Sequence, residues 1–161
     1  EVFDRRIFQP LGMTDTFLWN DVPEAGFGLP RSWFAAPFDY ETTDWNMSQG
    51  WAAGAVISTA DDMHRFMAGL LGGALFEDAA TLDLMEAGGP TTNATLLSYG
   101  LGLALKEGAL RGHGGQTLGF LSDVAAADDG SLSLVLWTTS ANNLGMLGAQ
   151  LVTQALAETA P

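Results

Sequence analysis

The sequence of 161 residues has no cysteine, only two histidines and a single lysine, Lys106. Without cysteine, disulfides, thiolate zinc sites and cysteine nucleophiles are excluded. Two histidines argue against a histidine-rich metal site, and we expect neither a metal nor a cofactor. The chain has six basic and 19 acidic residues, a net charge of −13, so the basic surface that a nucleic-acid binder needs is missing. A polybasic membrane anchor is excluded for the same reason. No apolar run approaches the roughly 18 residues of a transmembrane helix.

The chain does have enough apolar residues to form the core of one packed domain. Apolar residues make up 47% of it, which argues against disorder. Helical patterns dominate before Pro90 and strand patterns after it, an order that predicts the α+β class with an antiparallel sheet. We therefore expect residues 1–90 to supply helices and covering loops. Residues 91–161 should supply sheet strands and a C-terminal helix packed on the sheet.

The helical spacing of apolar residues predicts four helices. The first covers the start of the chain and stops at Pro10. The second spans 58–73, with Ser58 or Thr59 as its cap and two glycines at its end. A third covers 79–87, and a fourth begins at Asn142 or Asn143. Between them, residues 14–50 show no clean period and should form irregular covering structure.

Four strands are predicted after Pro90, over residues 99–107, 110–117, 118–126 and 131–138. Asp128-Asp129-Gly130 is a turn signal that joins the last two. The 131–138 strand is apolar on both faces, which is typical of a central strand with neighbours on both sides. The preceding strand supplies one neighbour, so we expect the other from outside this chain.

One stretch, residues 111–120, has the composition of a site. It carries glycines at 112, 114, 115 and 119 around His113. Glycine weakens a strand unless a ligand or another backbone approaches closely. The imidazole of His113 can donate, accept or carry charge near neutral pH. The alternative is a glycine-rich bulge with a hydrogen-bonded structural histidine.

The sequence shows no assembled nucleophile. No serine has glycine two residues before and after it, and no serine precedes Lys106 by three residues. Neither tyrosine begins a Y-x-N. We read His64 as a surface or boundary residue of its helix. Trp51 precedes Ala52-Ala53-Gly54 and either packs, as large aromatic residues usually do, or lines a cleft.

Four blocks, in order, resemble one protein family. They are Ile7-Phe8-Gln9-Pro10-Leu11-Gly12-Met13-Thr14-Asp15-Thr16, the run from Ala53 to Met63, Tyr99-Gly100-Leu101-Gly102-Leu103, and Gly112-His113-Gly114-Gly115 followed by Gly119-Phe120. Together they resemble the serine β-lactamase and penicillin-binding protein superfamily. The similar branch holds class C β-lactamases, D-alanyl-D-alanine carboxypeptidases and related esterases.

The resemblance implies that this chain is the C-terminal part of a larger β-lactamase/transpeptidase-like domain. Residues 1–161 would then be a single incomplete domain, with 1–90 in the helical lobe. The S-x-x-K and Y-x-N motifs would lie upstream of Glu1. His113-Gly114-Gly115 matches the third active-site motif, although Gly114 lacks the hydroxyl often found there. Gln116 matches the position whose backbone N–H forms half of the oxyanion hole. We place substrate contacts at Gly114, Gly115, Thr117 and Trp51.

The implied activity is that of a serine acyl hydrolase, with a carboxypeptidase or esterase favoured over a β-lactamase because His replaces Lys in the motif. Its partner is a small-molecule or peptide acyl substrate. The missing N-terminal half, or a second copy, would pair at strand 131–138. The family resemblance slightly favours an extracytoplasmic location. Two alternatives stay open: a non-catalytic relative that binds ligands in the same cleft, and an independent acidic α+β binding domain.

Overall fold

A computed structural model describes residues 2–21, 28–34, 39–92, 96–106 and 110–140. Its elements are η1 (Asp4–Phe8), α1 (Gln9–Leu11), β1 (Phe17–Leu18), η2 (Trp19–Asp21), β2 (Trp33–Phe34), β3 (Tyr40–Glu41), η3 (Met47–Ala53), β4 (Val56–Ile57), α2 (Ala60–Leu71), α3 (Ala80–Glu86), β5 (Leu96–Tyr99), β6 (Ala104–Lys106), β7 (Arg111–Thr117), β8 (Phe120–Ala126) and β9 (Ser133–Thr138). This mixture of helices and antiparallel strands confirms the predicted α+β class. None of the described helices is long and apolar enough to cross a membrane.

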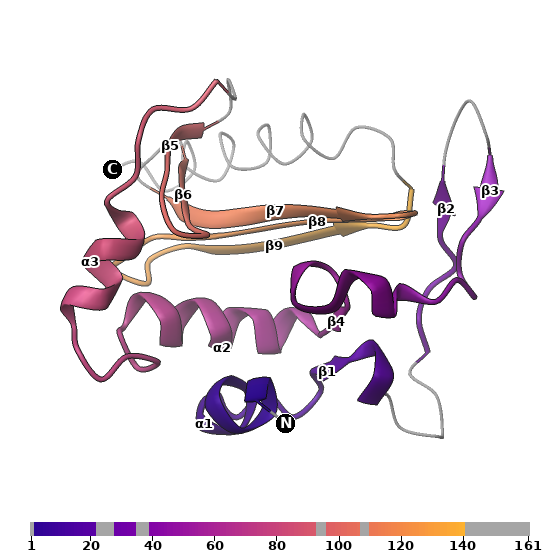
Figure 1. Cartoon of the computed structure of the whole chain (residues 1–161), viewed down its shortest axis with the longest axis horizontal. Coiled ribbons are helices and arrows are strands. Elements are labelled where there is room, and N and C mark those ends of the chain that lie inside the picture. Colours follow the sequence, from indigo (N-terminus) through magenta and orange to yellow (C-terminus); the bar gives the residue numbers. More distant parts are fainter. Residues whose placement is uncertain (1, 22–27, 35–38, 93–95, 107–109, 141–161) are drawn as a thin grey trace.

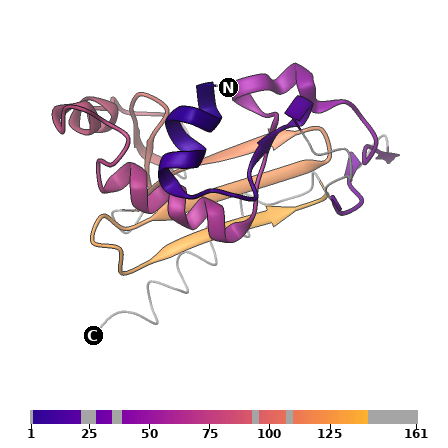
Figure 2. The same ribbon diagram turned by 90° about the horizontal axis from the view of Figure 1, so that it is seen from below.

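The main structural unit is a five-stranded antiparallel sheet in the order β5-β6-β7-β8-β9. Helix α2 runs along one face of this sheet, and the N-terminal helix lies on the far side of α2 (Figures 1 and 2). Two small ladders, β1-β4 and β2-β3, stand outside the sheet. The described residues of the segment 14–50 are mostly irregular, as predicted, with short strands and 3₁₀ turns among them.

Helix α2 forms where its apolar stripe predicts it. Thr59 is the cap, because its side-chain oxygen accepts the backbone N–H of Asp62. Gly73, with a φ of 74°, follows the last turn. Helix α3 also falls inside its predicted range of 79–87.

The N-terminal helix continues through Pro10, so the predicted stop was wrong. The chain from Asp4 to Phe8 forms a π-helical turn in which the N–H of Gln9 bonds to the carbonyl of Asp4. A π turn is wider than an α turn, which relieves the usual contact between a proline ring and the preceding turn. The helix ends instead at Gly12, whose φ of 66° is left-handed.

The strand predicted over 99–107 is two strands joined by a tight turn. The chain turns between Tyr99 and Ala104, where the N–H of Gly100 donates to the carbonyl of Leu103 at 2.8 Å. Gly102 has a φ of 75°, which turn geometry uses and a strand does not. The next two predicted strands are confirmed as β7 and β8.

Strand β9 starts at Ser133, two residues later than predicted, because the carboxylate of Asp129 accepts the N–H of Ser131 and extends the turn. Both faces of this end of the sheet are apolar. On one face Met67 of α2 packs with Val124, Ala126 and Val135. On the other face Leu110 and Ala125 pack with Ala127, Leu132 and Leu134.

Within the described residues, β9 is an edge strand whose ladder partner is β8. Beyond its end, the N–H of Trp33 donates to the carbonyl of Thr139 at 2.8 Å. The helix predicted after Asn142 lies outside the described residues.

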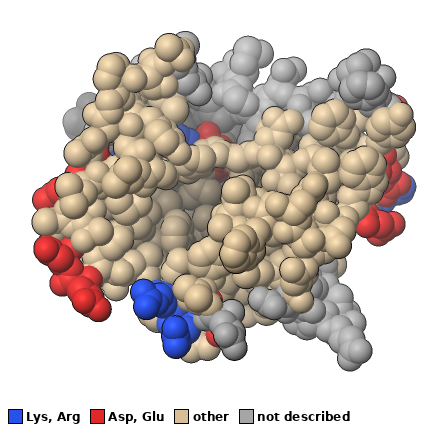
Figure 3. Space-filling view, viewed as in Figure 1, with Lys and Arg blue, Asp and Glu red and all other residues tan. Residues whose placement is uncertain are grey.

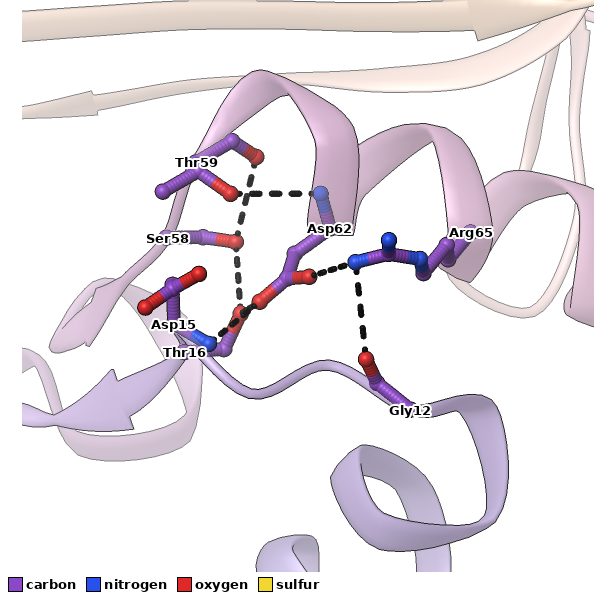
Figure 4. A network of polar contacts seen from close by, with 7 residues as sticks. All are labelled: Gly12, Asp15, Thr16, Ser58, Thr59, Asp62 and Arg65. Carbon is purple, nitrogen blue, oxygen red and sulfur yellow. Dashed lines mark hydrogen bonds and ion pairs between the residues drawn. The ribbon is translucent and has the colours of Figure 1, made fainter.

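A buried carboxylate joins the N-terminal segment to α2 (Figure 4). Asp62 is fully buried. One of its oxygens accepts the N–H of Asp15 at 2.9 Å and the hydroxyl of Thr16 at 2.8 Å. The other accepts a guanidinium N–H of Arg65 at 2.7 Å. Thr16 also bonds to Ser58 at 2.8 Å. This network fixes the entrance of α2, and with it the helix beneath the sheet.

Candidate functional site

The predicted site residues His113, Gly114, Gly115, Gln116 and Thr117 all lie on β7, in the middle of the sheet. The first four are exposed, whereas Val124, which pairs with His113 on β8, is buried and the β8 partners of the other three are half-buried. His113 is thus outside both apolar clusters. β7 is fully paired with β8, from Arg111 opposite Ala126 to Thr117 opposite Phe120.

The other edge of β7 is only partly covered. The short strand β6 pairs with it at Arg111 and Gly112, and no other described strand pairs with that edge beyond Gly112. The exposed glycines therefore border an open strand edge within the described part of the chain.

The ladder pattern decides which backbone groups point to this open edge. The N–H of Lys106 donates to the carbonyl of Leu110 at 2.7 Å, so that pair is hydrogen-bonded. Backbone groups alternate in direction along an antiparallel strand. Gly112, Gly114 and Gln116 accordingly direct their N–H and carbonyl groups away from β8. The amide N–H of Gln116 points to the open edge.

The ring of His113 has a partner at each nitrogen. Nε2 lies 2.7 Å from the hydroxyl of Tyr99 on β5. Nδ1 lies 2.5 Å from the carbonyl oxygen of Gly114. The rings of Tyr99 and His113 meet edge to face, with centroids 5.6 Å apart. Sequence reasoning missed this use of Tyr99. Its position in the Tyr99-Gly100-Leu101-Gly102 block was the available signal.

The far end of β7 is enclosed by two segments distant in sequence. A Cβ on Gly54 would lie 2.5 Å from Oγ1 of Thr117, so η3 ends against this strand. A Cβ on Gly119 would lie 2.4 Å from Oγ1 of Thr42 and 2.7 Å from the N of Trp33. The β7–β8 turn therefore admits only glycine at 119.

Two residues near this end of β7 have strained backbone conformations. Leu118, in the two-residue turn, has a φ of 50°, and Trp51 in η3 has a φ of 35°. Such values are outliers for bulky residues. Trp51 is 71% exposed, so it is not a core residue of the described part of the chain. The structure brings its helix, η3, to the end of β7 through Gly54 and Thr117. It shows no contact between Trp51 and His113.

His64 is a boundary residue, as read from the sequence, but it has a specific partner. Its Nδ1 lies 2.7 Å from the hydroxyl oxygen of Ser133, which links α2 to β9. Among the described residues, no group of three or more histidine, aspartate or glutamate side chains is arranged to hold a metal ion.

Most of the cations of the chain are neutralised by carboxylates. Lys106 forms an ion pair with Asp123. The other pairs are Arg31–Glu41, Arg65–Asp62 and Arg111 with both Glu86 and Asp128. The remaining two, Arg5 and Arg6, lie in the N-terminal helix, which α2 separates from the sheet. On the face shown in Figure 3, most of the charged side chains lie at the periphery and uncharged residues cover most of the middle.

Several solved structures share this fold. A D-stereospecific amidohydrolase from a Streptomyces species is 26% identical, with a TM-score of 0.70, covering 84% of this chain and 42% of that one. The D-amino acid amidase of Ochrobactrum anthropi SV3, in complex with D-phenylalanine, is 25% identical, with a TM-score of 0.76, covering 98% and 52%. An octameric penicillin-binding protein homologue from Pyrococcus abyssi shares the fold at 13% identity, with a TM-score of 0.77, covering 97% and 37%.

This chain therefore spans about half or less of the length of these proteins. The blocks that suggested the resemblance all fall inside one family-level match. The family model described as Beta-lactamase matches residues 1–157. That match covers nearly the whole chain and joins the helical segment, the sheet and the His113 strand in one unit: the chain belongs to the Beta-lactamase family.

Proposed function

We propose that this chain is the C-terminal part of a serine acyl hydrolase whose substrate is a neutral amide or ester. The acyl group would pass to a serine of an S-x-x-K motif upstream of Glu1, and water would then release it. Family membership and the half-length match to known amidases support this proposal. The chain would be one incomplete domain, with residues 1–90 in the helical lobe.

The observation that carries the proposal is the open edge of β7. His113 is exposed there, and the amide N–H of Gln116 points to the same edge. An N–H directed at a developing oxyanion stabilises the transition state by roughly 3–4 kcal/mol. In this proposal Gln116 supplies that donor through its backbone. His113 moves a proton near the nucleophile or the leaving group. Gly114, Gly115, Thr117 and Trp51 contact the substrate.

Charge favours a neutral substrate over one that ends in a carboxylate. A bound carboxylate needs a cationic or hydroxyl partner. Four of the six cations already have carboxylate partners, and Gly114 offers no hydroxyl, which leaves Thr117 as the one hydroxyl of β7. Two similar structures are an amidohydrolase and an amidase by name. We therefore place amides and esters ahead of carboxypeptidase substrates and β-lactams, which carry a carboxylate.

The test uses the longer protein that contains this chain. His113→Ala should lower kcat on a D-amino acid amide by about 10²- to 10⁴-fold, the range for an acid–base group. His64→Ala is the matched control and should keep kcat. Gln116→Pro should abolish activity, whereas Gln116→Ala should keep most of it, because only proline removes the N–H.

Equal activity in the two Gln116 variants would contradict the oxyanion role. Faster turnover of a D-alanyl-D-alanine peptide than of the amide would contradict the substrate class. A longer protein without S-x-x-K and Y-x-N would favour the competing proposal, a non-catalytic relative that binds ligands at the same edge.

A further inference from the structure

The two hydrogen bonds of the His113 ring determine where its proton sits. A carbonyl oxygen only accepts, so the contact of 2.5 Å between Nδ1 and the Gly114 oxygen requires the proton on Nδ1. In the neutral ring Nε2 is then unprotonated. It accepts the hydroxyl proton of Tyr99 across 2.7 Å. In water, by contrast, neutral histidine prefers to carry its proton on Nε2.

Tyr99 is held in place to make this contact. Its backbone N–H donates to the carbonyl of Gly89 at 3.1 Å, and its own carbonyl accepts the N–H of Gly89 at 3.2 Å. Tyr99 also pairs with Ala104 across the β5-β6 ladder. Gly89 thus engages both backbone hydrogen-bonding groups of Tyr99, while the residue is 40% exposed and its hydroxyl reaches the His113 ring.

We propose that Tyr99 is a positioning residue that keeps His113 in the Nδ1–H tautomer, with the Nε2 lone pair directed at the Tyr99 hydroxyl. The tautomer of a histidine is set by the hydrogen bond that its other nitrogen makes. Two bonds acting together, to Gly114 and to Tyr99, also fix the rotation of the ring. A fixed ring holds Nε2, the acceptor of its neutral form, together with the Tyr99 hydroxyl at one defined point beside β7.

This inference rests on the proposed function only for its catalytic consequence. If His113 accepts a proton during acyl transfer, Nε2 must take it, because Nδ1 is already protonated. The Tyr99 hydroxyl occupies the Nε2 lone pair, so it would pass its own proton to Nε2 and take one from the reacting group. Losing the Tyr99 hydroxyl should then lower kcat about 10- to 100-fold, the range found when a metal-bound histidine loses the partner that orients it.

The chain is well suited to a direct measurement, because it has only two histidines and two tyrosines. With ¹⁵N-labelled histidine, the ring-nitrogen shifts report the tautomer, and His64 is an internal reference. At about pH 8.5, above the ordinary titration range of histidine, wild-type His113 should show a protonated Nδ1. Tyr99→Phe keeps the ring contact and removes only the hydroxyl, so His113 should shift toward the Nε2–H form. Tyr40→Phe, on β3, should leave it unchanged.

A wild-type His113 with its proton on Nε2 would overturn the proposal without any variant, so the test holds even if Tyr99→Phe fails to fold. A folded Tyr99→Phe variant with an unchanged His113 tautomer would also overturn it. The spectra need no substrate. An inactive longer protein with the expected tautomer would therefore refute the proposed function and leave the role of Tyr99 intact.

Discussion

The buried carboxylate of Asp62 makes the sharpest stability prediction. Replacing Asp62 by Ala leaves the N–H of Asp15 without its acceptor and the hydroxyl of Thr16 with Ser58 as its one remaining partner. A buried donor left unsatisfied costs about 1–3 kcal/mol. The third partner, Arg65, is 51% exposed, so water can solvate it and its loss adds little. We expect Asp62→Ala to lower the free energy of unfolding by about 3 kcal/mol, a large share of the stability of a typical domain.

The assay is urea unfolding followed by tryptophan fluorescence, with Asp61→Ala as the matched control. Asp61 lies in the same first turn of α2, but it is exposed. There the lost charge–dipole interaction, about 0.3–1 kcal/mol, is offset by the better helix propensity of alanine. Arg65→Met should cost about 1–2 kcal/mol, because Asp62 keeps two of its donors. A loss below about 1 kcal/mol for Asp62→Ala, or equal losses for both aspartates, would refute this reasoning.

Three further measurements test other parts of the structure. The two hydrogen bonds from Arg31 lower the pKa of Glu41 from 4.5 to about 2. The pairing therefore stabilises the β2-β3 ladder above about pH 4.5, and this stabilisation is lost as the pH falls toward 2. An NMR titration of the carboxyl carbon should give this low pKa, and Arg31→Met should return it toward 4.5; no change in that variant would refute the assignment. Leu118→Gly should raise the free energy of unfolding by about 1 kcal/mol, because glycine relieves the strain of the positive φ. The control Leu97→Gly, on β5, should lower that free energy. A lower free energy of unfolding in both variants would contradict the strain at Leu118. A fluorescent penicillin or fluorophosphonate should leave the isolated chain unlabelled, and sedimentation should show the chain associated through the edge strand β9; a labelled monomer at low concentration would contradict both expectations.

The local sequence pattern was sufficient to predict those elements whose apolar period, capping residues and closing residues all agree. The apolar stripe, the Thr59 cap and the closing glycines all mark α2, so its bounds were predictable. The strand-like pattern after Pro90 likewise predicted β7 and β8, and the glycines around His113 marked the exposed strand. These features depend on residues within a few positions of each other, which is the range over which propensity and period act.

The remaining features depend on residues that are distant in sequence. Competition between local and tertiary contacts sets three of them. These are the π turn that carries the helix through Pro10, the turn that splits the 99–107 strand, and the exposure of Trp51. The short ladders β1-β4 and β2-β3 have too few residues to show a period. The partner of His113 is Tyr99, 14 positions earlier, and only the register of β5, β6 and β7 brings the two rings together. The sequence alone thus determined which strand is glycine-rich and carries a histidine. The tertiary structure decided which way its amides point and which side chain holds that histidine, because both depend on the neighbouring strands.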